Sequence, residues 1–185
     1  IGKRFLFPGI GYGGSCFPKD VKALQKAGRD ESYDFKILDS VIEVNEKQKT
    51  ILFPKIQNFF NGDLSNKKLA VWGLAFKPET DDVREAPAIY LIEKLLNKGA
   101  SLSVYDPEAM PNIKKQFGET LNYCNSMYEA LENADALIIC TEWSIFRTPD
   151  FNKVKQLLKQ CIIFDGRNLY DVEEIKKEGF IYTSI

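Results

Sequence analysis

The chain has 185 residues, of which 44% are hydrophobic, and its 25 basic and 26 acidic side chains give a net charge of −1. This length fits one sizeable hydrophobic core, or one core with a smaller appendage. The composition excludes a basic nucleic-acid-binding surface, and no apolar run is as long as a membrane-spanning helix. No signal peptide is recognisable and the first residue is not Met, so we expect a piece of a longer protein.

The cysteines and the absence of histidine limit the chemistry. Cys16, Cys124, Cys140 and Cys161 are far apart and form no CxxC pair, so we expect reduced thiols and a cytoplasmic protein. The last three lie in apolar runs, which favours a structural role. Without histidine the chain excludes a Cys–His dyad, a Ser–His–Asp triad and a histidine zinc site, and no metal site is expected.

The first segment, from Phe5 to Gly9, is apolar but interrupted by proline and glycine, which predicts a loop that a ligand or partner must cover. Gly9, Gly11 and Gly14 match the pattern G-x-G-x-x-G. No clear strand precedes them and no strand with a terminal acid follows, so we reject a dinucleotide fingerprint here. Together with Gly13, these glycines suggest backbone pressed close to a ligand.

Cys16 follows this glycine-rich turn and precedes a predicted helix. Ser15 is a favoured N-cap residue, and Pro18 suits a first helical turn. The Cys16 sulfur would then lie at the positive end of the helix dipole, which favours the nucleophilic thiolate. Lys19 adds a positive charge, and Asp20 follows Cys16 by one helical turn. The alternative is a small buried cysteine, the commoner situation for a lone cysteine.

The first helix is predicted over Val21–Ala27, and a long second helix from Tyr33 to about Phe60. Pro54 should kink the second helix because it removes one internal hydrogen bond, and Gly62 should end it as the C′ residue. The apolar residues of this helix spread over more than one face. This pattern predicts burial on two sides, either in the core alone or in the core and a subunit interface.

The remainder alternates short apolar strands with helices, which predicts an α/β fold with a parallel sheet covered by helices on both faces. The predicted strands are Lys68–Ala75, Leu102–Tyr105, Thr120–Cys124, Ala136–Cys140, Cys161–Phe164 and Phe180–Thr183. The predicted helices between them are Ala86–Lys98, Ser126–Asn133, Asp150–Gln160 and Asp171–Glu178. Ligands of such sheets bind beyond the carboxyl ends of the strands, so the residues after each strand are candidates for a binding site.

Three cations follow predicted strands. Lys77 and Arg84 come after the first strand, in a turn that has a single glycine, so side chains rather than backbone would meet a phosphate. Arg167 follows the strand Cys161–Phe164. The alternative is that these cations are solvated and balanced by nearby carboxylates.

Four motifs occur in one order: GYGGSCFPKD, GLAFKPETDDVREAP, YDPEA and FDGRN. They resemble the nucleotide-sugar 6-dehydrogenases of the UDP-glucose/GDP-mannose dehydrogenase family, and the resemblance covers essentially the whole chain. It implies an NAD-dependent oxidation of UDP-glucose to UDP-glucuronate. The alternatives are a GDP-mannose or UDP-N-acetyl-mannosamine dehydrogenase, or a non-catalytic UDP-sugar-binding or dimerisation module.

The resemblance also implies roles for individual residues. Cys16 would trap an aldehyde as a thiohemiacetal and later carry a thioester, and Asp20 would help to position or deprotonate water. Lys19 and Arg84 resemble contacts to the cofactor NAD. The residues that resemble nucleotide-sugar contacts are Phe5, Leu6, Phe7, Pro8, Gly9, Gly13, Lys77 and Arg167.

The same resemblance implies two domains. Residues 1–63 would belong to the central helical and dimerisation domain with the catalytic cysteine loop, and residues 64–185 would form a Rossmann-like domain that binds the UDP-sugar. The family's N-terminal NAD domain, and its catalytic lysine and asparagine, have no counterpart in this sequence. We therefore expect that this chain alone does not turn over substrate. The resemblance also implies a homodimer.

Overall fold

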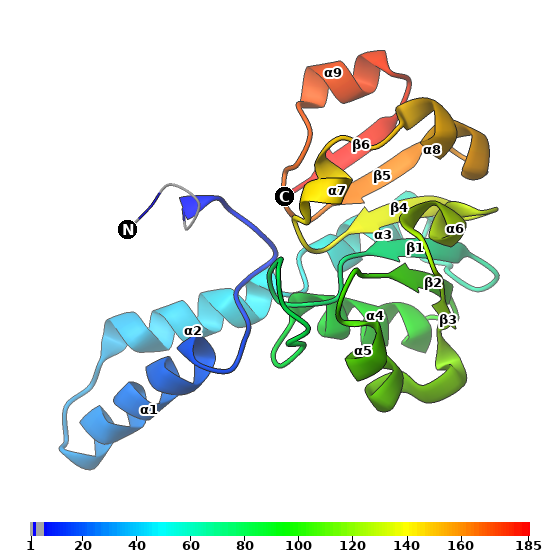
Figure 1. Cartoon of the computed structure of the whole chain (residues 1–185). Helices are drawn as coiled ribbons and strands as arrows, with labels where there is room; N and C mark the ends of the chain where they lie inside the picture. Colours follow the sequence, from blue (N-terminus) through cyan, green and yellow to red (C-terminus); the bar gives the residue numbers. More distant parts are fainter. Residues whose placement is uncertain (1, 3–5) are drawn as a thin grey trace.

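The structure, a computed structural model, describes residue 2 and residues 6–185. Two helices, α1 (Phe17–Asp30) and α2 (Lys36–Gln48), form a hairpin that projects from an α/β domain (Figure 1). The hairpin precedes the α/β domain in the sequence. In Figure 1, the loop before α1 runs between the hairpin and the domain. None of the helices in the described part of the chain is both long and apolar enough to cross a membrane.

The centre of the α/β domain is a six-stranded parallel sheet in the order β3-β2-β1-β4-β5-β6. Its strands are β1 (Lys68–Trp72), β2 (Ser101–Tyr105), β3 (Asn122–Tyr123), β4 (Ala136–Ile139), β5 (Ile162–Asp165) and β6 (Ile181–Ser184). The central strands are short and apolar because helices bury both of their faces. The predicted α/β class and all six predicted strands are therefore confirmed.

Alternate residues of β1 point to opposite faces of the sheet. Leu69 and Val71 pack in a core with α3 (Leu52–Phe59), α4 (Pro87–Asn97) and α5 (Met110–Phe117). Trp72 packs in a second core on the other face. The helices of that second face, which follow the short turn η2 (Gly118–Thr120), are α6 (Met127–Leu131), α7 (Ser144–Arg147), α8 (Phe151–Leu157) and α9 (Val172–Lys177). The sequence analysis did not predict α5 or α7.

The predicted long helix from Tyr33 to Phe60 is wrong, because the helix is interrupted: α2 ends at Gln48 and α3 begins at Leu52. Pro54 has no N–H to donate to the carbonyl of Thr50, and its ring would clash with that carbonyl, so a new helix begins with Pro54 in its first turn. The end of α3 also differs by one residue from the prediction. Asn61 is the C′ residue with φ 53°, and Gly62 follows it and donates its N–H to the carbonyl of Gln57.

Because the helix is interrupted, α3 packs against the sheet rather than continuing the hairpin. Leu52 and Ile56 of α3 are 1% and 0% exposed, and both lie in the core against the sheet. The predicted domain boundary between residues 63 and 64 stays a prediction, although the helix before that boundary packs with the α/β domain.

The hairpin is held together mainly by polar contacts. Asp39 of α2 accepts hydrogen bonds from Gln25 and from Arg29 of α1, the latter at 2.7 Å. Gly28 is buried under the ring of Phe35, where a Cβ atom would overlap with the ring. Close packing of the two helices at this point therefore requires glycine.

Candidate active site

A cleft of about 2000 Å³ lies between the hairpin and the carboxyl ends of the strands. Its walls come from the loop before α1, from α2, and from the turns after β1, β4 and β5. The order of the strands reverses between β1 and β4, and a crevice at such a switch point is the usual ligand site of an open α/β sheet. The expected position of the site, beyond the carboxyl ends of the strands, is thus where the cleft lies.

Cys16 lines this cleft and stands at the start of α1, with Pro18 in the first turn. Its own backbone is the N-cap, whereas Ser15 had been predicted in that position. The Cys16 thiol is exposed, and the Ser15 hydroxyl oxygen lies 3.6 Å from its sulfur. The alternative of a buried cysteine is therefore wrong for this residue. The N-terminal end of a helix dipole favours negative charge, so this position favours a thiolate.

The two charged residues that follow Cys16 lie outside the cleft wall as the described residues define it. The Lys19 ammonium is 3.5 Å from the Asp20 carboxylate, and both side chains are largely exposed. The amide N–H of Asp20 donates to the Cys16 carbonyl, so the two residues are one helical turn apart, as predicted. An exposed pair of this kind is weak, so either side chain can reorient toward a bound group.

Arg84 is also exposed and does not line the cleft within the described chain. Its guanidinium donates two 2.9 Å hydrogen bonds to the Asp82 carboxylate, which hold the pKa of Asp82 below its ordinary value. This pairing follows the alternative interpretation of the sequence, in which neighbouring carboxylates balance the cation.

Lys77 and Arg167 both line the cleft, from the turns after β1 and β5. Lys77 is exposed, and its ammonium is 5.3 Å from the centroid of the Phe76 ring. Arg167 is mostly buried, and its Nε lies 2.7 Å from a carboxylate oxygen of Glu142 without the alignment of a hydrogen bond. The contact is therefore electrostatic, and the guanidinium keeps donors for a ligand.

Asp165 holds the turn that carries Arg167. Its buried carboxylate accepts hydrogen bonds of 2.7 Å from the N–H of Arg167, the N–H of Leu169 and the hydroxyl of Tyr182. Burial raises the pKa of Asp165, although these hydrogen bonds favour its charged form. The motif FDGRN thus fixes an arginine at the end of β5 through the aspartate that ends the strand.

Of the predicted contacts in the N-terminal loop, Phe7, Gly9 and Gly13 line the cleft, whereas Leu6 and Pro8 are exposed elsewhere. Phe5 lies outside the described residues.

The glycines of the loop are pressed against the protein itself. A Cβ atom at Gly9 would overlap with the Arg167 guanidinium, one at Gly13 with the carbonyl of Glu85, and one at Gly14 with the ring of Phe76. Their packing on the rest of the chain accounts for these glycines without a ligand, and the inference that they also press against a ligand is not tested by it. The assignment of Gly9 and Gly13 to a ligand stays a prediction.

The end of β1 does not fit a dinucleotide. In nucleotide-binding Rossmann folds the free backbone N–H groups after the first strand cradle a pyrophosphate. Here the N–H groups of Leu74 and Ala75 donate to the buried carboxylate of Asp106, at 2.6 and 3.1 Å. Trp143 donates to the same oxygen at 3.1 Å. These N–H groups are therefore occupied by an internal carboxylate, so a phosphate at this turn would have to be bound by side chains, as the single glycine of the turn predicts.

Arg147, a cleft residue, was missed by the sequence analysis. It ends α7, is exposed, and makes no ion pair in the described part of the chain. Helix α7 is anchored by buried Phe146, whose carbonyl accepts a hydrogen bond from the Tyr170 hydroxyl. A second cation without a carboxylate partner thus joins Lys77. The described residues also contain no group of three His, Cys, Asp or Glu side chains that could hold a metal ion.

Comparisons with known proteins agree with this geometry. The model of the UDP binding domain of the UDP-glucose/GDP-mannose dehydrogenase family matches residues 70–172, and that of the family's central domain matches residues 1–47. The chain is 45% identical over 185 residues to UDP-glucose 6-dehydrogenase TuaD of Bacillus subtilis. It is 43% identical over 190 residues to a UDP-glucose 6-dehydrogenase of Pseudomonas aeruginosa.

A solved structure is also similar: a UDP-glucose dehydrogenase from the archaeon Pyrobaculum islandicum is 32% identical and matches 94% of this chain with a TM-score of 0.82. The two bacterial matches cover 100% of this chain but only 40% and 42% of those relatives, and the archaeal match covers 38% of that chain. The chain therefore spans about two fifths of the length of these relatives. The resemblance seen in the four motifs is confirmed, and the chain belongs to the UDP-glucose/GDP-mannose dehydrogenase family.

Proposed function

We propose that the chain is part of a cytoplasmic, NAD-dependent UDP-glucose 6-dehydrogenase, which oxidises the 6-hydroxymethyl group of the sugar to a carboxylate. The observation that carries this proposal is the cleft in which Cys16, at the start of α1, shares one space with Lys77 and Arg167. A thiol at a helix N-terminus suits covalent chemistry on a carbonyl carbon, and a lysine with an arginine suits a diphosphate.

The proposed role of Cys16 is nucleophilic. Its thiolate adds to the aldehyde carbon that the first oxidation produces, and the new carbon–sulfur bond gives a thiohemiacetal. Oxidation of this adduct leaves a thioester on the sulfur. Water then attacks the thioester carbon, the carbon–sulfur bond breaks, and the acid and the thiolate are released. Asp20 is the candidate for positioning or deprotonating this water, since it follows Cys16 by one helical turn.

The backbone N–H groups of Leu74 and Ala75 after β1 are bonded to Asp106, so we assign to the residues of this chain only the carbon and sulfur chemistry. Lys19 and Arg84 are exposed and outside the cleft wall, and they remain candidates for contacts to an anionic cofactor bound by another part of the enzyme. We expect that the 185-residue chain alone does not reduce NAD with UDP-glucose, and steady-state turnover by the purified chain would contradict this.

Nucleotide binding tests the assignment of the cations. Calorimetry on the chain should find tighter binding of UDP-glucose than of GDP-mannose. Lys77→Ala should weaken UDP binding by about 1.5–3 kcal/mol, tenfold or more, because it removes a charge-assisted contact to phosphate. Lys177→Ala, which removes an exposed lysine of α9 outside the cleft, is the matched control. Equal UDP affinity in Lys77→Ala and wild type would reject the assignment.

Two other functions remain testable. A UDP-D-ManNAc dehydrogenase of Pyrococcus horikoshii is 29% identical with a TM-score of 0.76, so a UDP-N-acetylhexosamine is the second substrate candidate. Tighter binding of such a sugar than of UDP-glucose would favour it. A non-catalytic binding module would keep full function after Cys16→Ser, whereas the proposed enzyme should no longer release the acid product.

We also propose a homodimer. Ile37, Val41 and Val44 share one face of α2 and are 79%, 36% and 62% exposed. They also line the cleft, so a second copy that covers this apolar stripe would close one side of the cleft. Light scattering at micromolar concentration should give twice the chain mass, and Val44→Glu should give a monomer. Val172→Glu, at an exposed valine of α9, should leave the dimer intact. A monomeric wild-type chain would count against the proposal.

A further inference from the structure

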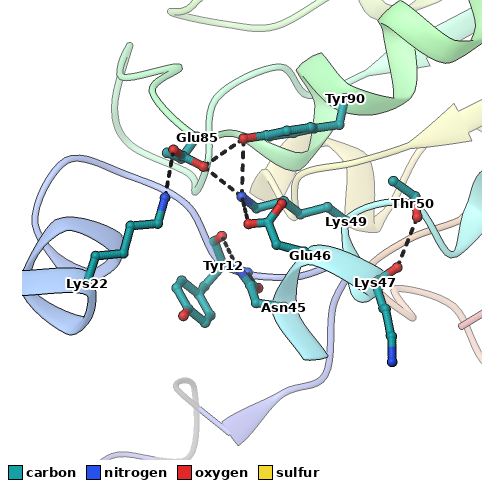
Figure 2. A network of polar contacts seen from close by, with 9 residues as sticks. All are labelled: Tyr12, Lys22, Asn45, Glu46, Lys47, Lys49, Thr50, Glu85 and Tyr90. Carbon is teal, nitrogen blue, oxygen red and sulfur yellow. Dashed lines mark hydrogen bonds and ion pairs between the residues drawn. The ribbon is translucent and has the colours of Figure 1, made fainter. Parts of the chain in front are cut away.

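A charged lysine is buried where the hairpin joins the α/β domain. Lys49 directly follows α2, and its side chain is 1% exposed. A buried ammonium is unfavourable unless opposite charges and acceptors surround it. The Lys49 Nζ lies 2.7 Å from Glu85 Oε2, 2.9 Å from Glu46 Oε1 and 3.3 Å from the hydroxyl oxygen of Tyr90. All three hydrogens of the ammonium therefore have an acceptor (Figure 2).

The partners of Lys49 come from separate parts of the chain. Glu85 lies in the long turn between β1 and α4, and Tyr90 in α4 donates a 2.7 Å hydrogen bond to Glu85. Lys22 of α1 contacts the other carboxylate oxygen of Glu85 at 3.4 Å. The hydrogen bonds from Lys49 and Tyr90 lower the pKa of Glu85 to about 2, so the pair is charged at neutral pH. We call Lys49, Glu85 and Tyr90 the junction cluster.

One side of the cysteine loop rests on α2 beside this cluster. Asn45 holds the backbone of Tyr12 with two hydrogen bonds, one accepted from its N–H at 2.8 Å and one donated to its carbonyl at 3.2 Å. Gly11 lies directly against α2, where an added Cβ would come within 2.9 Å of Asn45 Oδ1 and 3.1 Å of Lys49 Cγ. Only glycine therefore allows the loop backbone to lie this close to Asn45 and to the stem of the Lys49 side chain.

The other side of the loop rests on the backbone next to Glu85. The N–H of Gly14 donates to the carbonyl of Arg84 at 2.8 Å, and Gly13 packs on the carbonyl of Glu85 so closely that a Cβ would overlap with it. Cys16 follows Gly14 by two residues. The loop that leads into Cys16 is thus clamped between two surfaces, and the ion pair of Lys49 and Glu85 joins those surfaces.

We propose that Lys49 and Glu85 are positioning residues for Cys16: their buried ion pair holds the loop before α1 so that the thiol meets the sugar carbon of a nucleotide sugar bound in the cleft. This inference rests on the proposed function. Lys77 precedes Glu85 on the same long turn, and Arg167 stands on the turn after β5. Neither side chain contacts the junction cluster within the described residues, so we expect that nucleotide binding and thiol placement can be measured separately.

The test measures both properties on the chain. Calorimetry gives the affinity for UDP, and iodoacetamide alkylation of Cys16, followed by mass spectrometry, gives the protection that bound nucleotide sugar provides. In wild type, saturating UDP-glucose should slow alkylation about tenfold or more, because a correctly placed thiol is covered by the sugar. UDP alone should protect much less, since it lacks the sugar.

Lys49→Met keeps the length of the side chain but removes its charge. It should leave UDP affinity within about twofold and reduce the protection by UDP-glucose to about twofold, because the loop is no longer clamped. Lys49→Arg, which keeps the charge, should recover part of the protection. Lys47→Met is the matched control, since Lys47 lies in the last turn of α2, is exposed and has Glu43 as its one ion-pair partner among the described residues.

Unchanged protection in Lys49→Met overturns the proposal, and so does a parallel loss of protection and UDP affinity. If Lys49→Met binds no UDP at all because it does not fold, Tyr90→Phe decides, since it removes one hydroxyl from the cluster and keeps the ring. Lower protection at equal UDP affinity in Tyr90→Phe supports the proposal, and equal protection overturns it. Absence of protection in wild type instead rejects the proposed function, and the inference with it.

Discussion

The hairpin and the α/β domain are stabilised in different ways. Helix α4 buries six of its 11 residues against the sheet, whereas α1 buries only Pro18 and Gly28 of its 14 and α2 only Asn45 of its 13. Leu24, Ile37 and Val44 of the hairpin remain exposed. The candidate nucleophile therefore stands on the lightly packed part, and the candidate phosphate-binding cations stand on the rigid one.

This difference explains why the base of the hairpin is polar. Ile10 anchors the start of the cysteine loop in the apolar core. Closer to Cys16, hydrogen bonds and the ion pair around Asn45 and Lys49 hold the loop as well. The strength of such polar contacts changes with pH and with the loss of a single donor or acceptor atom. The stability of the sheet core instead depends on how completely apolar side chains fill its volume. Substitutions should therefore have different effects in the two regions.

Thiol reactivity should show the largest difference between the regions. Burial raises the pKa of the Cys140 thiol at the end of β4 to about 12, which disfavours the reactive thiolate, and also shields the sulfur from reagents. Cys16 on the hairpin is exposed and should be alkylated by iodoacetamide first, many times faster than Cys140. Mass spectrometry of each cysteine measures this. In urea all four thiols should react alike, and equal rates in the folded chain would contradict the prediction.

Loss of a buried carboxylate should have the largest effect on stability. Asp106→Ala removes the acceptor of Leu74, Ala75 and Trp143, and also the acceptor of the N–H of Ala109. Because each orphaned buried donor costs about 1–3 kcal/mol, the free energy of unfolding in urea should fall by about 4 kcal/mol. Asp30→Ala, at an exposed aspartate at the end of α1, should change it by less than about 0.5 kcal/mol. Similar decreases in the free energy of unfolding for the two variants would show that backbone N–H groups at the end of the sheet can lack an acceptor at little cost.

Leucine truncation should separate the two regions directly. Leu91 of α4 is 1% exposed and Leu24 of α1 is 51% exposed. Leu91→Ala should lower the free energy of unfolding by about 3 kcal/mol, since it leaves a cavity in the core. Leu24→Ala should lower it by less than about 0.5 kcal/mol, unless a second copy covers the hairpin. A larger loss for Leu24→Ala that grows with protein concentration would therefore indicate that this face is an interface.

The sheet could be predicted because its signals are local. Each strand is a short apolar run bounded by turn residues, and all six appear within a few residues of their predicted ends. The first strand stops at Trp72 rather than Ala75, since Gly73 turns with φ 86° and Asp106 binds the next two N–H groups. Helix α5 was missed because it is only eight residues long and Ile113 alone is fully buried, although Met110 and Phe117 on the same face also pack on the core.

The site could be predicted only in part. Lys77 and Arg167 reach one cleft because the carboxyl ends of parallel strands share one edge of the sheet. Arg147 enters through α7, a helix of four residues that has too little sequence for a pattern. Lys49 lies in a polar segment, so its sequence context predicts a surface lysine. Its partner Glu85 is 36 residues away in sequence. Burial of such a pair depends on how the hairpin docks, which no local pattern records.

Among the predicted changes in stability, the smallest is the loss at acid pH of the stabilisation that the charged Glu85 gives to the junction cluster. The pKa of Glu85 is about 2 in the folded chain, below its ordinary value of 4.5, mainly because Lys49 donates a hydrogen bond to it. A lowered carboxylate pKa stabilises the fold above pH 4.5, and this contribution is lost progressively as the pH falls toward 2. Since the Glu85 side chain is 33% exposed, solvent screens the pair and the contribution is about 1 kcal/mol.

Urea unfolding of wild type and Glu85→Gln at pH 6 and pH 3 measures this contribution. The difference between the two proteins should be largest at pH 6 and should shrink by most of that amount at pH 3, because the glutamate loses its charge in the unfolded chain first. Glu43→Gln is the matched control, since Glu43 forms an exposed pair with Lys47 and should show no measurable difference at either pH. An equal difference at both pH values for Glu85→Gln would mean that shape rather than charge holds the hairpin to the sheet.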